Sequence, residues 1–246
     1  MTPRIILVPY DGSRPAQSAL QASMLIAEAR GARLKGLFVM DQKVIHGHFY
    51  EDLAGAAGVA PFLGLEQQSR RAFARIGKGL MASFEKQCAA RKVACETLVV
   101  EDAVANGIVT AARKADLVVL GQRGSRGASG PIGSNVERVV RHSPVPVLIV
   151  PHEFKSVRRV LVGYDGSIHG KDTLKMALAA TAWFGGSLTV LHVSSDADGE
   201  KILLGEYPAV PVRNAAEIYE ELFRVWARAL RKRHLGGNGD GRLFGV

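Results

Sequence analysis

A ten-residue segment near the start of this chain occurs again, in altered form, in its second half. Residues 4–13 read Arg-Ile-Ile-Leu-Val-Pro-Tyr-Asp-Gly-Ser, and residues 158–167, 154 positions later, read Arg-Arg-Val-Leu-Val-Gly-Tyr-Asp-Gly-Ser. The same offset aligns further identical residues without gaps: Leu20 with Leu174, Gly31 with Gly185, Leu34 with Leu188 and Val39 with Val193. This period is far longer than the roughly 20–50 residues of solenoid repeats. It indicates a duplicated domain, with the junction near residues 151–156.

Composition narrows the class of protein. Hydrophobic residues make up 47% and charged residues 22% of the 246 residues, which excludes a largely disordered or collagen-like chain. No apolar run approaches the roughly 18 residues of a membrane span, so no membrane partner is expected. The segment Met1–Arg4 leads straight into an apolar strand pattern without the features of a secretory signal, which favours a cytoplasmic location. Cys88 and Cys95 fit neither a disulfide framework nor a zinc pattern, and we interpret them as ordinary cytosolic thiols.

The net charge of +9 favours contact with anions such as nucleotides, nucleic acid or anionic lipid. Many basic residues follow two helical stretches: Arg70, Arg71, Arg75, Lys78, Lys86, Arg91 and Lys92 in one, and Arg224, Arg228, Arg231, Lys232 and Arg233 in the other. Solvated helix faces explain most of them. Aromatic residues do not alternate with these basic residues, as a base-stacking groove requires, so nucleic acid is not the expected partner.

Residues 1–152 show the pattern of strands alternating with helices. Strands are predicted at 5–8, 34–40, 95–100, 116–120 and 145–150, helices at 15–30, 65–92, 103–114 and 134–142, and a loop at 41–64. Asp11-Gly12-Ser13 reads as a turn that caps the first helix, and Gly31 is placed to end it. Pro146 within the last strand indicates an edge position or a gap in the hydrogen-bond ladder. The predicted fold is α/β, with an open, mostly parallel five-stranded sheet and helices on both faces.

The segment between the fourth strand and the fourth helix is rich in glycine. It holds Gly121, Gly124, Gly127, Gly130 and Gly133, followed by Ser134 and Asn135. Glycines let backbone N–H groups approach an anion, and the helix start adds unpaired donors and a positive dipole end. Neither a Walker A motif nor the G-x-G-x-x-G dinucleotide fingerprint is present. Such a loop can also be a plain surface loop, but ligands of open α/β sheets bind at the carboxyl ends of the strands.

These motifs together resemble the universal stress protein family. The resemblance rests on Pro9-Tyr10-Asp11-Gly12-Ser13 after the first strand and on a loop that begins Gly121-x-x-Gly124 and ends in Gly133-Ser134. It implies an adenine nucleotide alpha hydrolase-like fold, and the ATP-binding branch carries Gly-x2-Gly-x9-Gly-Ser/Thr. Here eight residues, not nine, separate Gly124 from Gly133.

The resemblance also implies a nucleotide site with ATP as its ligand and Mg²⁺ as an optional companion. Asp11 would stand near adenine and ribose with Pro9 beside it, and the backbone of Val39 would meet the adenine edge. Leu120, Gly121 and Gly124 would border ribose and phosphates, and Gly133, Ser134 and Asn135 would hold the phosphate tail.

The second copy, residues 157–246, is expected to be partial. It retains Asp165 and Val193, and Gly163 replaces Pro9. A loop is predicted at 194–211 and a helix at 214–234, with an apolar stripe of Leu222, Val225, Trp226, Ala229 and Leu230 and a glycine-rich tail at 236–241. Strand four, the glycine loop and strand five have no counterparts, so the strand at its start should have an unpaired edge. Because family members pair through their fifth strands, we expect a homodimer through Val145–Val150.

No catalytic or metal-ligating residues are predicted. His46 and His48 have no ligand partner at suitable spacing, and no general base stands beside the glycine loop. The leading hypothesis is an ATP-binding stress-response or signalling module. The alternatives are a slow ATPase and a nucleotide-free adaptor whose basic helices bind an acidic partner.

Overall fold

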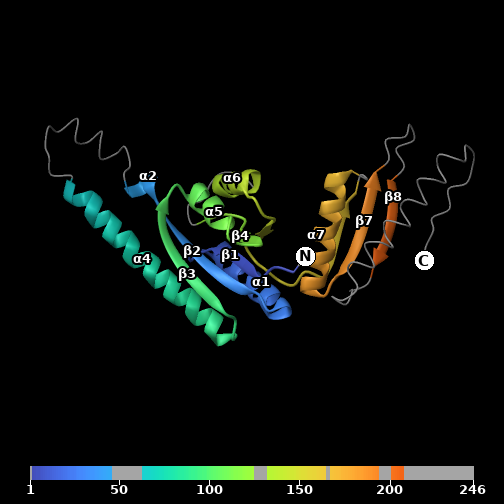
Figure 1. The fold of residues 1–246 in the computed structure, drawn as a ribbon, viewed down its shortest axis with the longest axis horizontal. Helices are drawn as coiled ribbons and strands as arrows, with labels where there is room; N and C mark the ends of the chain where they lie inside the picture. The colour runs from blue at the N-terminus through green and yellow to red at the C-terminus, as the bar shows by residue number, and fades with distance from the viewer. Residues whose placement is uncertain (1, 46–62, 125–131, 165–166, 194–200, 208–246) are drawn as a thin grey trace, which may run out of the picture. The chain divides into compact units, whose positions relative to one another are not determined.

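A computed structural model describes residues 2–45, 63–124, 132–164, 167–193 and 201–207. Within these ranges the chain divides into two compact units, with the boundary between Phe154 and Lys155. Each unit has its own sheet (Figure 1).

The first unit is built on a five-stranded parallel sheet. Its elements, in chain order, are β1 (Ile5–Pro9), α1 (Arg14–Arg30), β2 (Arg33–Asp41), α2 (Gln42–Ile45), α4 (Leu63–Ala90), β3 (Cys95–Asp102), α5 (Val104–Ala112), β4 (Leu117–Gly121), α6 (Ser134–His142) and β5 (Val147–Val150). The strand order is β3-β2-β1-β4-β5, and every neighbouring pair is parallel. The predicted fold class is therefore confirmed.

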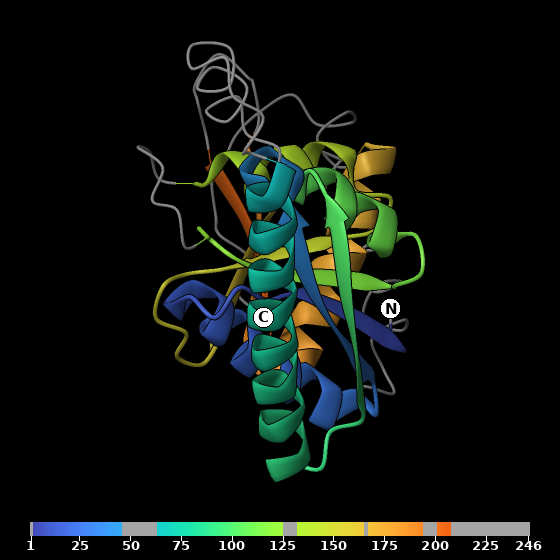
Figure 2. The same ribbon diagram turned by 90° about the vertical axis from the view of Figure 1, so that its left-hand side faces the viewer.

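Helices cover both faces of this sheet. Helix α4 lies over β2 and β3, in front of them in Figure 2, and α5 and α6 lie on the opposite face. Under α5 and α6 the core includes Leu7 from β1, Leu37 from β2 and Val118 from β4. Under α4, the fully buried Phe84 fills the space that Gly36 leaves, where a Cβ would lie 3.0 Å from the ring.

The second unit repeats the first three elements of the first. It contains β6 (Arg159–Gly163), α7 (Ile168–Phe184), β7 (Ser187–Val193) and β8 (Lys201–Tyr207). The parallel register of β6 with β7 has the same 154-residue offset as that of β1 with β2.

The ends of the first helix are also the same in the two units. Ser13 caps α1 and Ser167 caps α7, each accepting a hydrogen bond from a backbone N–H three residues on. Gly31 and Gly185 end these helices at a φ of 66°, a left-handed conformation that favours glycine. The duplication seen in the sequence is thus a duplication of backbone geometry.

The structure corrects three sequence predictions. The loop expected at 194–211 contains strand β8, whose sequence includes an apolar Ile-Leu-Leu run. Strand β8 pairs antiparallel with β7 and so occupies an edge of β7 that would otherwise be unpaired. The loop expected at 41–64 begins with the last residue of β2 and with α2, and α4 already starts at Leu63. Pro146 precedes β5 instead of lying within it, and its carbonyl accepts a hydrogen bond from the Val118 N–H at 3.0 Å.

Strand β5 is an edge strand of the first sheet, as Pro146 indicated. In the part of the second unit that the structure describes, β6 pairs with β7 alone, which matches the expected unpaired edge. The predicted helix at 214–234, the tail at 236–241, Asp165 and the histidines His46 and His48 lie outside the described residues. Among the helices that the structure describes, none has the length and apolar character needed to cross a membrane.

Candidate functional site

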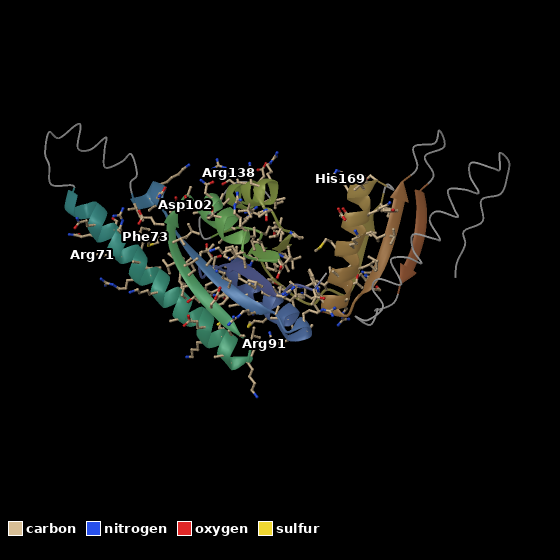
Figure 3. All side chains as sticks on the ribbon, in the orientation of Figure 1. Arg71, Phe73, Arg91, Asp102, Arg138 and His169 are labelled. Carbon is tan, nitrogen blue, oxygen red and sulfur yellow. The ribbon has the colours of Figure 1, made fainter. Side chains whose placement is uncertain are left out.

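The candidate site lies where β1 and β4 end, side by side. These strands are parallel neighbours, and the chain leaves them in opposite directions, toward β2 through α1 and toward β5 through α6. Such a reversal opens a crevice at the carboxyl ends of the strands, where ligands of α/β sheets bind. In Figure 3 the labelled Asp102, the last residue of β3, marks this end of the sheet, and Arg91 marks the opposite end.

The turn after β1 is held by the carboxylate of Asp11. Its Oδ1 accepts a hydrogen bond from the Ser13 N–H at 3.0 Å, and the Ser13 hydroxyl in turn caps α1. Gly12 has a φ of 77°, and a Cβ there would lie 2.7 Å from Cδ2 of Leu80 on α4. The turn is therefore fixed by its own hydrogen bonds and by α4 above it.

The loop after β4 approaches this turn at Gly124. A Cβ at Gly124 would lie 3.2 Å from Oδ2 of Asp11, closer than most real Cβ contacts. Gly124 itself is exposed and Asp11 is half-buried. The structure thus brings together two of the predicted site residues that are far apart in sequence, and a side chain at 124 would intrude on the carboxylate.

The start of α6 returns to the same loop. The Gly133 N–H donates to the Gln122 carbonyl at 3.1 Å, and Gly133 caps α6 without a side chain to accept from the first-turn donors. Ser134 and Asn135 follow it and are exposed. The first N–H groups of a helix have no intrahelical acceptor and attract anions. The site therefore combines a carboxylate at the end of β1 with an anion-attracting helix start.

The other predicted site residues contribute backbone or packing. Pro9 is the last residue of β1, next to Leu37 of β2. The side chain of Val39 lies against α5, where a Cβ at Gly107 would be 3.1 Å from it. Leu120 is buried in the core, and a Cβ at Gly121 would lie 2.5 Å from the Pro15 carbonyl carbon. Gly121 therefore permits close packing of β4 on α1.

Four residues that shape the site were missed by the sequence interpretation: Pro15, Leu80, Gly107 and Gln122. Pro15, Leu80 and Gly107 act by packing against a glycine or valine distant in sequence, and Gln122 acts through its backbone carbonyl. Only a glycine within a helix, as at Gly107, is a sequence signal of such close approach. Arg126 and the rest of residues 125–131 lie outside the described residues.

The fold and the site define an open, parallel α/β protein with a glycine-rich loop and a helix start at the switch point of its sheet. The model of the universal stress protein family matches residues 2–151 and again residues 156–229. The chain belongs to the universal stress protein family.

Individual relatives agree with this assignment. A universal stress protein from Thermus aquaticus is 34% identical over 151 residues, which cover 60% of this chain and 98% of that protein. The universal stress protein Slr1230 of Synechocystis is 43% identical over 54 residues, but these span only 21% of this chain and 19% of that protein.

A solved structure with a TM-score above 0.5 shows the same fold. A universal stress protein from Archaeoglobus fulgidus has a TM-score of 0.58 at 23% identity, over 80% of this chain and 68% of its own. A universal stress protein family protein from Arabidopsis thaliana, solved with AMP bound, has a TM-score of 0.43 at 16% identity, over 61% of this chain and 93% of its own. The AMP belongs to that protein.

Proposed function

We propose that the first unit binds an adenine nucleotide at the carboxyl ends of β1 and β4, and that the protein is an ATP-binding module of stress response or signalling in the cytoplasm. The observation that carries the proposal is the meeting of Gly124 with the Asp11 carboxylate beside the start of α6. A carboxylate that accepts hydrogen bonds and an anion-attracting helix start, placed at a switch point, suit a ligand with hydroxyl and amino groups at one end and a phosphate tail at the other.

The residues divide between the two ends of such a ligand. The backbone N–H groups at Ser134 and Asn135 would bind phosphate oxygens, because the helix start offers donors and the positive end of the helix dipole. Asp11 would face the nucleoside, since a carboxylate accepts hydrogen bonds from hydroxyl and amino groups and repels phosphate. Bound Mg²⁺ would supply charge neutralisation at the phosphates. The backbone would line the base of the nucleotide site at four residues: Pro9, Val39, Leu120 and Gly121.

The first experiment is to identify what the purified protein carries. The protein is denatured, and the supernatant is analysed for adenine nucleotides, alongside a thermal shift assay with added ATP. Bound ATP supports the proposal. ADP together with phosphate release from added ATP indicates a slow ATPase, and no nucleotide with no thermal shift indicates an adaptor.

The second experiment tests the site. Gly124→Val places a branched side chain where a Cβ alone would already lie 3.2 Å from Asp11 Oδ2, so we expect ATP affinity to fall at least tenfold, which is about 1.4 kcal/mol. Gly79→Val is the matched control, because a Cβ at Gly79 has no atom within 4 Å and stands on the exposed side of α4. Unchanged ATP affinity in the folded Gly124→Val protein would contradict this location of the site.

A further inference from the structure

The two cysteines lie at the same corner of the first unit. Cys88 is in the last turn of α4, and Cys95 is the first residue of β3. The intervening turn is tight, because the N–H groups of Arg91 and Val93 both donate to the Cys88 carbonyl, at 3.1 Å and 3.0 Å. This corner is at the end of α4 that Arg91 marks in Figure 3, opposite to the candidate nucleotide site.

The backbone on both sides of the turn is fixed. The Leu34 N–H donates to the Ala94 carbonyl at 2.8 Å, and Leu34 pairs with Cys95 in the parallel ladder of β2 and β3. On the helix side, Phe84 is fully buried one turn before Cys88. The positions of both cysteines are therefore set by regular secondary structure.

The side chains of the two cysteines face each other. Cys95 lies on the same face of β3 as Thr97, whose hydroxyl donates to the Glu85 carboxylate of α4 at 2.6 Å, so Cys95 faces α4 about one turn beyond Glu85, where Cys88 lies. Cys88 is fully buried and Cys95 is half-buried. Burial, together with Cys95 and Glu85 nearby, raises the pKa of the Cys88 thiol to about 12. Cys88 is thus a protonated thiol in an apolar setting, and Cys95 is the member of the pair that a small reagent can reach.

We propose that Cys88 and Cys95 form an oxidisable dithiol, a modification site that takes up a hydroperoxide and closes to a disulfide between α4 and β3. The half-buried Cys95 sulfur attacks the terminal peroxide oxygen as a thiolate, which breaks the O–O bond and leaves a sulfenic acid. The Cys88 sulfur then attacks the Cys95 sulfur, and hydroxide leaves and takes up the Cys88 proton as water. Two thiols and one hydrogen peroxide yield one disulfide and two waters.

The contact geometry explains why the buried Cys88 can complete the reaction. A resolving thiol needs to reach only the sulfur it attacks, and the packing of β3 on α4 places Cys95 opposite the helical turn that holds Cys88. Such transient disulfides are the form in which cytosolic proteins use cysteine pairs for redox sensing. The cysteine pair lies at the end of α4 away from the candidate nucleotide site, and a disulfide would fix the helix whose Leu80 packs at Gly12.

The test is peptide mapping of the full chain after treatment with hydrogen peroxide and blocking of free thiols. Trypsin cleaves at Lys86, Arg91, Lys92 and Arg113, so the cysteines separate into peptides 87–91 and 93–113 when reduced. We expect a linked peptide pair about 2 Da lighter than the sum of the two, which dithiothreitol separates. Cys95→Ser should abolish the link, and Cys88→Ala should leave a sulfenic acid at Cys95 that dimedone traps.

Two outcomes would overturn the proposal. One is a wild-type protein that keeps both thiols, or oxidises Cys95 alone, under peroxide. The other is a link formed only between chains, which mixing ¹⁵N-labelled with unlabelled protein before oxidation reveals. Because the wild-type protein is itself the main sample, neither outcome depends on whether a variant folds.

Discussion

Gly121, the last residue of β4, and Gly124, in the loop that follows, have different physical reasons to be glycine. At Gly121 a Cβ would lie 2.5 Å from a backbone atom of Pro15, whereas at Gly124 the nearest atom to a Cβ is a carboxylate oxygen 3.2 Å away. The Pro15 backbone is part of helix α1 and cannot move aside, but the Asp11 side chain can rotate slightly. Substitution of Gly121 should therefore lower the stability of the fold, whereas substitution of Gly124 should lower the affinity for the ligand.

We expect Gly121→Ala to lower the free energy of unfolding by about 2 kcal/mol, because overpacking of a buried contact forces β4 and α1 apart. Gly124→Ala should change it by less than about 0.5 kcal/mol, since Gly124 is exposed. Urea denaturation of the two variants measures both. Equal stabilities would show that Gly121 is not a packing residue.

The sequence predicted candidate site residues but not the packing that distinguishes them. Asp11, Gly124, Gly133 and Ser134 were predicted from motif and resemblance, and the structure brings Asp11 next to Gly124 and Gly133 next to Gln122. The packing role of Gly121 depends on Pro15, which is distant in the chain, so no local pattern reports it.

At the scale of elements, the start of β1 is fixed by a side chain from the segment that leads into β4. Oδ2 of Asp116 accepts hydrogen bonds from the N–H groups of Arg4 at 2.8 Å and Ile5 at 2.9 Å. A carboxylate that accepts two backbone donors holds the central strands in register at their amino ends.

Asp116→Ala should therefore lower the free energy of unfolding of the first unit by about 2 kcal/mol, because it leaves two backbone donors without this acceptor. Asp172→Ala is the control, since Asp172 is exposed on α7 and its ion-pair partner among the described residues, Lys175, lies 3.2 Å away across one helical turn on the same helix. Thermal unfolding followed by circular dichroism compares them. A Tm for Asp116→Ala as high as that of the control would contradict the anchoring role.

Elements with strong periodicity or clear end signals were predictable. The capped helix α1 and the apolar strand β4 appear within a residue or two of the predicted bounds, because their signals are local. Strand β8 was missed, since seven residues beside a loop-like stretch become a strand only by pairing with β7. Pairing partners are a tertiary property, and that is why the second copy was harder to interpret than the first.

At the scale of the whole molecule, β5 is one of the two edge strands of the first sheet, and among the described strands it pairs with β4 alone. The Pro146 carbonyl accepts a hydrogen bond from the N–H of Val118 in β4 at 3.0 Å. The Val150 carbonyl accepts one from the N–H of Gln122, directly after β4, at 2.8 Å. Because the backbone groups of successive residues in a strand point to opposite sides, those of Val147 and Ile149 point away from β4. On the side away from β4, strand β5 thus presents a short row of donors and acceptors, which a second copy of β5 could pair with.

We propose that the protein is a homodimer through this edge, and Ile149→Pro is the variant that tests it. Proline at 149 removes an outward N–H and no bond to β4, so it should convert a dimer of about twice the 26.4 kDa chain mass to a monomer in analytical ultracentrifugation. Ile149→Ala is the control, because it loses the same packing on the core beneath α5 and α6 but keeps the N–H, and it should remain a dimer. A wild-type protein that sediments as a monomer at every concentration would exclude the dimer. A dimer that persists in a folded Ile149→Pro variant would place the interface elsewhere on the molecule.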